Sequence, residues 1–202
     1  MHWWTLQLIA VALVAAPASA GASTWRIDPV HSAAQFGVRH LMVSTVRGNL
    51  GKVTGVVNLD DTDVSKSSVE AAIDATGIDT RDPKRDEHLR AADFLDVARY
   101  PTITFKSTKV SRLAEDRYQV TGNLTMRGVT KEIVLDVEGI PKPFNDPFGN
   151  IKLGGVARTK ISRKDFGITW NKALDTGGAV VGDAVDITID IELTQQVAPA
   201  AR

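Results

Sequence analysis

The chain has 202 residues, of which 24 are Lys or Arg and 24 are Asp or Glu, and it contains no cysteine. The balanced charge argues against nucleic acid as a partner, because phosphate binding needs an excess or a stripe of basic side chains. Without cysteine there is neither a disulfide nor thiol chemistry, so the hydrophobic core alone must stabilise the fold. The length suits one domain with a sizeable core.

Residues 1–20 have the pattern of a signal peptide. An apolar run from Leu6 to Ala16 is too short to span a bilayer, and an Ala-Ser-Ala tripeptide ends at Ala20, as at many cleavage sites. No Lys or Arg precedes the apolar run, so a retained anchor is the alternative interpretation. We expect cleavage after Ala20, export to the periplasm, and a single domain formed by residues 21–202.

From residue 32 onward, apolar and polar residues alternate with a period of two, most clearly in residues 184–193. Such alternation is typical of strands with one buried face and one solvated face. It predicts strands at residues 32–40, 46–60, 68–78, 101–110, 117–126, 129–139, 150–161 and 184–193. Turn-rich segments separate them. An antiparallel meander of this kind forms a sandwich or a closed barrel, and an eight-stranded barrel can hold one small ligand.

Several inward positions of the predicted strands carry small residues. These are Ala71, Ala75, Gly122, Gly155 and Ala157, with Gly48, Gly51 and Gly55 on one further segment. Small residues either leave space for a cavity or let strands bend at barrel corners. Both interpretations stay open at this point.

One charged segment, residues 79–96, interrupts the strands. Asp82 before Pro83 predicts a helix start, with Asp82 as the N-cap. The charged side chains would solvate the outer side, while Leu89, Phe94 and Leu95 would face inward. Because a short helix with one apolar patch must bury that patch, residues 83–96 are predicted to form a lid over an open barrel mouth. A carboxylate-based catalytic or metal site is the competing hypothesis.

The residues that could carry chemistry are few. Three histidines, His31, His40 and His88, could in principle hold a zinc ion, but His31 and His40 lie nine residues apart on one extended segment. They are too far from each other to share an ion, so we expect no metal site. We expect His31 and His40 to cap strand ends with hydrogen bonds. No nucleophile elbow, P-loop or dinucleotide fingerprint occurs in the sequence, and we expect no enzymatic activity.

Four motifs occur in an order that resembles the YceI family of exported lipid-binding proteins. They are "DPVHS" followed by "FGVRH", "RDEHLRAADFLDVARYPTITFKS", "VTGNLTMRGVTKEI", and "ISRKDFGITWN" followed by "VGDAVDITIDIEL". The similarity extends from Trp25 to Thr194, which makes residues 25–194 the expected core of the domain.

The resemblance implies an all-β fold, an eight-stranded antiparallel lipocalin-like barrel whose apolar lumen accepts a polyisoprenoid or another long amphiphile. It implies a periplasmic carrier or storage protein, with some members linked to quinone or respiratory chemistry or to stress responses. A bound isoprenoid, quinone or other lipid would be the ligand, with no further cofactor. The resemblance also permits a homodimer and transient membrane contact. A filled barrel that serves as an interaction or stress protein, and a lipid-modifying enzyme, are the alternatives.

Two groups of side chains are the candidate binding residues. The predicted lining residues are Phe36, Val38, Ile73, Phe94, Phe105, Leu124, Phe166 and Trp170. The predicted head-group contacts are Arg39, His40, Arg81, Arg85 and His88. A diphosphate head would favour arginine, whereas a quinone head needs only hydrogen-bond donors. Ordinary core packing is the competing interpretation for every lining residue.

Overall fold

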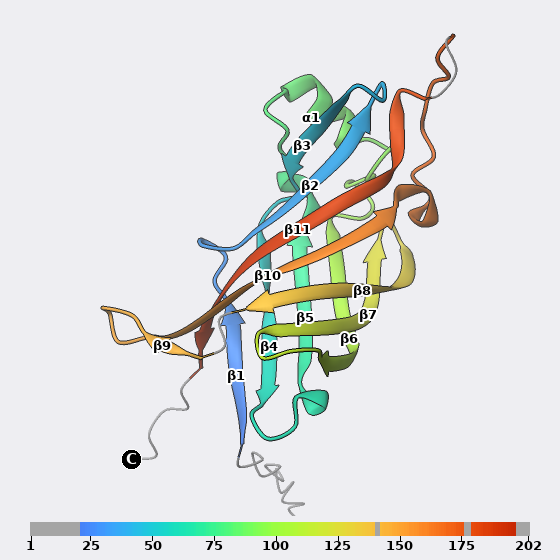
Figure 1. Cartoon of the computed structure of the whole chain (residues 1–202). Helices are drawn as coiled ribbons and strands as arrows, with labels where there is room; N and C mark the ends of the chain where they lie inside the picture. The colour runs from blue at the N-terminus through green and yellow to red at the C-terminus, as the bar shows by residue number, and fades with distance from the viewer. Residues whose placement is uncertain (1–20, 140–141, 176–178, 197–202) are drawn as a thin grey trace, which may run out of the picture.

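The computed structural model describes residues 21–139, 142–175 and 179–196, so the predicted signal peptide lies outside the described residues (Figure 1). Strands make up most of this part of the chain. In chain order the elements are β1 (Ala22–Ile27), β2 (Ala33–His40), β3 (Ser44–Asn49), β4 (Val53–Asp60), η1 (Val64–Lys66), β5 (Ser68–Asp74), η2 (Ala75–Gly77), α1 (Pro83–Arg90), β6 (Thr102–Arg112), β7 (Arg117–Met126), β8 (Val129–Gly139), β9 (Phe144–Asn145), β10 (Ile151–Ser162), η3 (Arg163–Phe166) and β11 (Val181–Gln195). The fold is all-β with one short α-helix.

Eight of these strands close into an antiparallel barrel, which confirms the predicted fold class. The ring runs β11–β1–β4–β5–β6–β7–β8–β10 and returns to β11. Every pairing in it is antiparallel. Closure leaves each ring strand hydrogen-bonded on both edges, which removes the exposed edges that would otherwise invite aggregation.

A second, open part of the sheet continues beyond this ring. One edge of β11 pairs with β1 at Leu193–Gln195 and with β2 at residues 181–190, and β3 pairs with the outer edge of β2. We call β2, β3 and the first half of β11 the wing. Among the described residues, the outer edge of β3 makes one isolated β-bridge, between Asn49 and Asp79. The wing therefore extends the barrel wall on one side only, at the upper end in Figure 1.

The predicted strands match most of the observed ones, but β9 was not predicted, and the strand predicted at residues 68–78 ends at Asp74, where η2 begins. Two further differences affect how the sheet is built. Residues 46–60 form two strands, because the chain turns at Gly51, which has a φ of 127°. A side chain there would meet the carbonyl oxygen of Asp74 at 1.9 Å, so only glycine fits. β1 was not predicted, yet it closes the ring by pairing with β11 and β4, and it buries Trp25 and Ile27.

The small inward residues do not create the cavity. At Gly122 the ring of Phe105 lies 2.5 Å from the position that a Cβ atom would take, and at Gly48 the ring of Phe36 lies 2.8 Å from it. The space that these glycines leave is filled by neighbouring aromatic rings. Their role is close packing, so the expectation that small residues leave room for a ligand is wrong at these positions.

The charged segment forms the predicted helix and covers one end of the barrel. Asp82 has an extended backbone and accepts hydrogen bonds from the amides of Lys84 and Arg85, with Pro83 in the first helical position. The helix ends at Arg90, earlier than the predicted limit of residue 96, and turns continue the segment to Tyr100. We call residues 79–100 the lid. It closes the gap beside the outer edge of β3.

Candidate functional site

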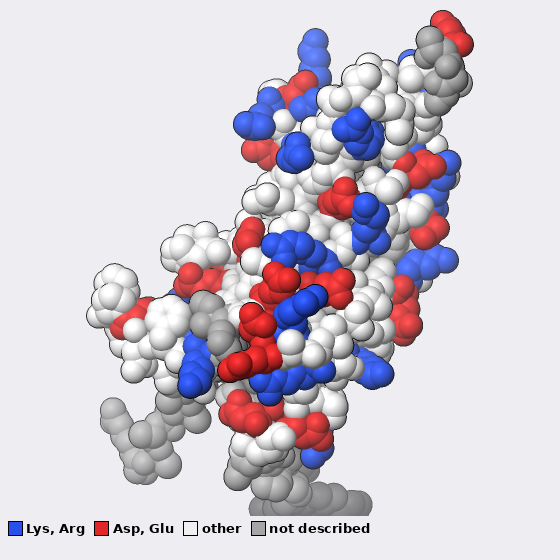
Figure 2. Space-filling view, in the orientation of Figure 1, with Lys and Arg blue, Asp and Glu red and all other residues white. Residues whose placement is uncertain are grey.

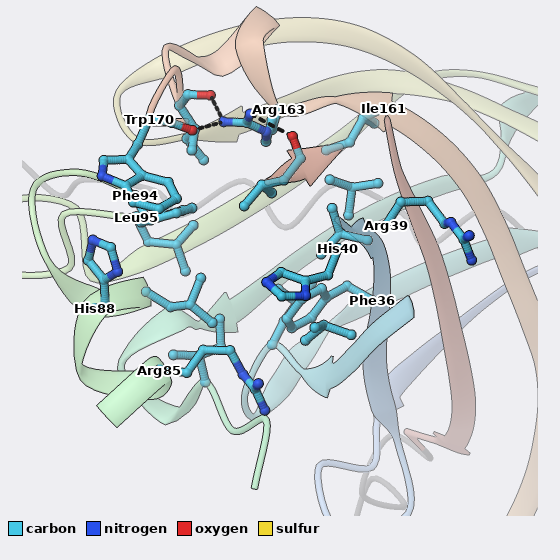
Figure 3. Close-up of a pocket in the computed structure, with 18 of the residues that line it drawn as sticks. Phe36, Arg39, His40, Arg85, His88, Phe94, Leu95, Ile161, Arg163 and Trp170 are labelled. Carbon is cyan, nitrogen blue, oxygen red and sulfur yellow. Dashed lines mark hydrogen bonds between the residues drawn. The ribbon is translucent and has the colours of Figure 1, made fainter. Parts of the chain in front are cut away.

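A cavity of about 260 Å³ lies between the wing and the lid (Figure 3). Apolar side chains from the wing, the lid and the top of the ring form most of its wall. They are Phe36, Val38, Val46, Leu50, Ile78, Leu89, Phe94, Leu95, Met126, Ile161, Ile168, Trp170, Val180, Val181, Val185 and Ile187. Because side chains alternate between the two faces of a strand, β2 contributes Phe36, Val38 and His40 to this wall, and β11 contributes Val185 and Ile187.

Hydrogen bonds to backbone groups hold the lid in place. The buried carboxylate of Asp86 accepts from the amide and the hydroxyl of Thr80, at 2.8 and 2.5 Å. Arg90 donates to the carbonyl oxygens of Thr76 and Ile78. Arg127, in the turn between β7 and β8, donates to the carbonyl oxygens of Ala92, in the lid, and of Gly167. The Thr80–Asp86 bonds thus stiffen the lid itself, whereas Arg90 ties it to the preceding turn and Arg127 ties its middle to Gly167.

An aromatic cluster forms the inner face of the lid. The His88 ring packs edge-on against Phe94 and Trp170, with ring centroids 4.9 and 5.0 Å apart. Its Nε2 lies 3.2 Å from the carboxylate of Asp93. Edge-to-face contacts of this kind fix ring orientation, so His88 connects the lid to Trp170, which follows η3 in the chain.

Five polar side chains line the cavity, and four of them already have partners. Arg39 donates to the Thr45 hydroxyl and the Met42 carbonyl, and Arg85 donates to the hydroxyl and carbonyl of Thr80. No carboxylate lines the cavity within the described chain. The lining thus presents only cations, imidazoles and hydrocarbon to a ligand.

His40 differs from the other polar lining residues. Its ring has no hydrogen-bond partner among the described residues, and Figure 3 shows it among the lining side chains, whereas the Arg39 guanidinium points away from them. An imidazole can donate or accept one hydrogen bond to a polar group of a ligand. His40 is therefore the best-placed residue for contact with a polar head.

Arg163 is the fifth polar lining residue, and it plays a structural role. Its side chain is 3% exposed and donates to the carbonyl oxygens of Gly182, Ile168 and Trp170, as the dashed lines in Figure 3 partly show. It also pairs with Asp183 at 3.2 Å. A buried cation needs such a shell of acceptors, so Arg163 organises the chain between η3 and β11.

The structure brings together eight of the predicted binding residues and separates the other five. Around the cavity are Phe36, Val38, Arg39, His40, Arg85, His88, Phe94 and Trp170. Ile73, Phe105 and Leu124 belong to the packed core of the ring, Phe166 is buried at the end of η3, and Arg81 is exposed at the lid. None of these five lines the cavity. The ligand contacts of all thirteen stay predictions.

Sequence reasoning missed Arg163 and much of the cavity floor. Ile161, Val185 and Ile187 stand on inward faces of predicted strands, so alternation could have found them. Arg163 offered no such signal, because it follows β10 in a run of charged residues, "SRKD". Its burial depends on carbonyl groups from β11, more than fifteen residues later.

A second charged cluster joins the end of β1 to β11. Asp28, His31 and Glu192 have their ligand-type atoms within 4.8 Å of one another. The Lys152 ammonium lies 2.8 Å from Glu192 and 3.4 Å from Asp28, so it already supplies the positive charge. The His31 hydrogen bond lowers the pKa of Asp28, and the Asp28 carboxylate raises the pKa of His31. This cluster is an ion-pair network at the junction of ring and wing.

None of the described helices is both long enough and apolar enough to cross a membrane.

Comparison with known proteins identifies the family. The model of the YceI-like domain matches residues 25–193. A UPF0312 protein of Pectobacterium carotovorum is 37% identical over 193 residues, covering 95% of this chain and 96% of that protein. A UPF0312 protein of Serratia proteamaculans is 38% identical over 189 residues, covering 93% and 94% of the two chains.

Solved structures share the fold. The YceI protein of Campylobacter jejuni has a TM-score of 0.65 and 28% identity, covering 79% of this chain and 90% of that one. A polyisoprenoid-binding domain from Saccharophagus degradans, implicated in plant cell wall breakdown, has a TM-score of 0.60 and 14% identity, covering 85% and 98%. With a family model that spans the barrel, the wing and the lid, this chain belongs to the YceI family.

Proposed function

We propose that this protein is an exported carrier or storage protein that encloses part of a polyisoprenoid, or of a similar long-chain amphiphile, between the wing and the lid. The observation that carries the proposal is the cavity, which is walled by hydrocarbon and has no carboxylate in its described lining. The polyisoprenoid-binding domain of Saccharophagus degradans has the same fold, which supports this class of ligand. Export follows from the predicted signal peptide.

The cavity suits hydrocarbon because apolar surface leaves water favourably, at about 25 cal/mol per Å². Enclosing ~250 Å² of a chain would therefore contribute roughly 6 kcal/mol before the costs of association. The wall is mostly hydrocarbon and the Arg163 guanidinium is already surrounded by acceptors, so the polar groups available to a ligand are His40 and the outer arginines. The tail would lie inside, and the head would stay near His40 and Arg85.

The cavity volume limits how much of the ligand is enclosed. At about 260 Å³ it lies just below the range of roughly 300–1,000 Å³ that is usual for sites of drug-sized ligands. Below it, Phe105, Leu124 and Ile73 pack the ring, so the tail has no open path through them. We infer that a long chain is held by one end, with the remainder between the wing and the lid or outside it.

The test is uptake of a prenyl lipid by a variant whose cavity is blocked. Val46 on β3 lines the cavity, so Val46→Trp would fill it. Val134 on β8 is 42% exposed and gives a matched Val→Trp control. Native mass spectrometry after incubation with a prenyl alcohol should show a complex for the wild type and for Val134→Trp, and little complex for Val46→Trp. Equal uptake by both variants would refute this binding site.

The same measurement can report the natural ligand. Protein purified from a bacterial extract should carry an amphiphile with a long hydrocarbon tail, whose mass identifies its head group. Consistently empty protein that also fails to take up prenyl alcohol would refute the proposed function as a whole.

A further inference from the structure

The turn between β2 and β3 exposes three consecutive apolar side chains. Leu41, Met42 and Val43 are 39%, 56% and 78% exposed. Leu41 and Met42 have φ values of 50° and 60°, a backbone region that usually selects glycine or asparagine. Three apolar residues at a position that a turn alone would fill with polar residues or glycine indicate a binding role. We call these residues the tip.

In the stretch of sequence around the tip, the charged residues are all basic, although Asp183 on the neighbouring strand β11 pairs with Arg163 and Lys164 close by. No Asp or Glu occurs between Asp28 and Asp60, whereas Arg39, Arg47 and Lys52 lie within that stretch. Arg39 and Arg47 stand on β2 and β3, and both are exposed. Figure 2 shows white surface and blue side chains over the upper ends of these two strands. Apolar residues flanked by arginine match an anionic lipid surface, where the apolar groups enter and the cations meet headgroups.

The tip is also continuous with the cavity. The Leu41 amide donates to the carbonyl oxygen of Val180, and Val180, Val38 and His40 line the cavity. A hydrocarbon chain that leaves a membrane at the tip would thus reach the cavity wall along apolar side chains. Because of this continuity, the hydrocarbon chain would not have to cross water between the membrane and the cavity.

The shape of the tip favours a membrane over a protein partner. A stable protein interface needs about 800 Å² from each partner, more than three side chains at the end of one hairpin supply. A bilayer surface accepts a narrow projection, because lipids close around it. We propose that the β2–β3 tip inserts into the surface of an anionic phospholipid bilayer and places the cavity mouth against it. This docking role extends the proposed lipid-carrier function, but it is tested separately.

The chain has no cysteine, so a single introduced cysteine can be labelled without ambiguity. Val43→Cys would carry an environment-sensitive nitrobenzoxadiazole label at the tip. Leu113→Cys is the control, because Leu113 is 57% exposed and follows β6, a full strand length away from the lid. Each labelled full chain is mixed with vesicles of phosphatidylethanolamine and phosphatidylglycerol. We expect a blue shift and stronger emission at position 43 and neither at position 113.

Two substitutions separate the apolar and the charged contributions. In a vesicle flotation assay, Val43→Asp should weaken partitioning about tenfold, because the Val side chain that enters the bilayer is replaced by a charged one. Arg47→Gln should weaken it about fivefold, the effect of one basic residue near an anionic surface, and high salt should remove this difference. All variants share residues 1–20, so any contribution of that apolar segment is equal in each of them.

The outcomes are distinct. An unchanged label spectrum at position 43, or an equal change at position 113, overturns the docking proposal. So does concentration-dependent dimerisation that Val43→Asp abolishes, since the tip would then be a contact between copies of the chain. Uptake of prenyl alcohol from solution should be the same for wild type and Val43→Asp. If that uptake is absent in both, the carrier function fails, whatever the vesicles show.

Discussion

The ring and the wing are continuous in hydrogen bonding but differ in packing. In the ring every strand is paired on both edges, and side chains such as Trp25, Val53 and Phe105 fill the interior. In the wing, β3 has an outer edge that meets the lid, and the space beneath is a cavity. The comparison teaches that one barrel can have a closed part filled by side chains and an open part that encloses a cavity. The filled-barrel hypothesis fits the ring, and the proposed carrier function rests on the wing.

Two phenylalanines with nearly equal exposure test this division most strongly. Phe105 in the ring is 9% exposed and Phe94 in the lid is 8% exposed. Phe105→Ala should lower the free energy of unfolding by about 4 kcal/mol, because a packed core cannot collapse around the void. Phe94→Ala should cost about 2 kcal/mol, chiefly the contacts with His88 and Trp170, because it already faces a cavity. Urea unfolding measures both values.

Binding should respond in the opposite order. Phe94→Ala is expected to weaken prenyl-alcohol binding, whereas Phe105→Ala should leave the affinity of the folded protein unchanged. Equal losses of stability would mean that the lid packs as tightly as the ring. Weaker binding in Phe105→Ala would place that residue in the site after all.

Substitution of Arg163 tests whether this one buried cation stabilises the segment that leads into the wing. Arg163→Gln should lower the free energy of unfolding by about 3 kcal/mol, because several buried carbonyl oxygens lose a charged donor. The matched control is Arg158→Gln on β10, whose partner Glu138 is exposed. That change should cost less than about 0.5 kcal/mol. Similar losses for the two variants, measured by urea unfolding, would contradict the structural role of Arg163.

Much of the ring was predictable because alternation is a local signal. The strands at residues 117–126 and 129–139 were predicted with their observed limits, since one face of each is buried and the other is solvated. The start of the lid helix was predictable because its signal is local too. Asp82 caps the helix by accepting hydrogen bonds from neighbouring amides, and Pro83 fits the first helical position, so neither depends on a distant part of the chain.

The division into ring and wing was not predictable, because it depends on which strands pair. β11 carries the same alternation from Val185 to Leu193, yet one edge of the strand pairs with β1 at one end and with β2 over the rest. Phe36 and Phe105 look alike in the sequence, but Phe36 lies under the cavity and Phe105 in the packed ring. Only the pairing register separates them, and that register is a long-range property.

The cap of the lid helix gives a smaller and more local effect. Asp82→Ala removes the acceptor for the amides of Lys84 and Arg85, at a cost of about 1 kcal/mol. Because the lid contributes little to the packed ring, we expect faster amide hydrogen exchange in residues 83–90 and an almost unchanged exchange in the ring strands. Asp63→Ala, which removes the cap of η1, is the control that should leave the lid unaffected. Faster exchange throughout the ring would contradict the separation of the two regions.

The junction of ring and wing should add the smallest effect, a dependence of stability on pH. The Asp28 hydrogen bond and charge raise the pKa of His31 above its ordinary 6.5, so this contribution is complete below pH 6.5 and is lost as the pH rises through the raised value. The pKa of Asp28 is lowered, mainly by the His31 hydrogen bond, so its contribution is present above 3.8 and is lost as the pH falls further. The pair therefore stabilises most between these two values.

His31→Gln should flatten the decline of the thermal midpoint above pH 6.5, because the imidazolium no longer has to lose its proton in the folded state. The change should be small, since the His31 side chain is 62% exposed and Lys152 keeps its own contact with Asp28. His88→Gln is the control, as its partner Asp93 lies in the lid. If the slope above pH 6.5 survives His31→Gln, the junction does not sense pH, and the ring and the wing are joined there by the Lys152 contacts alone.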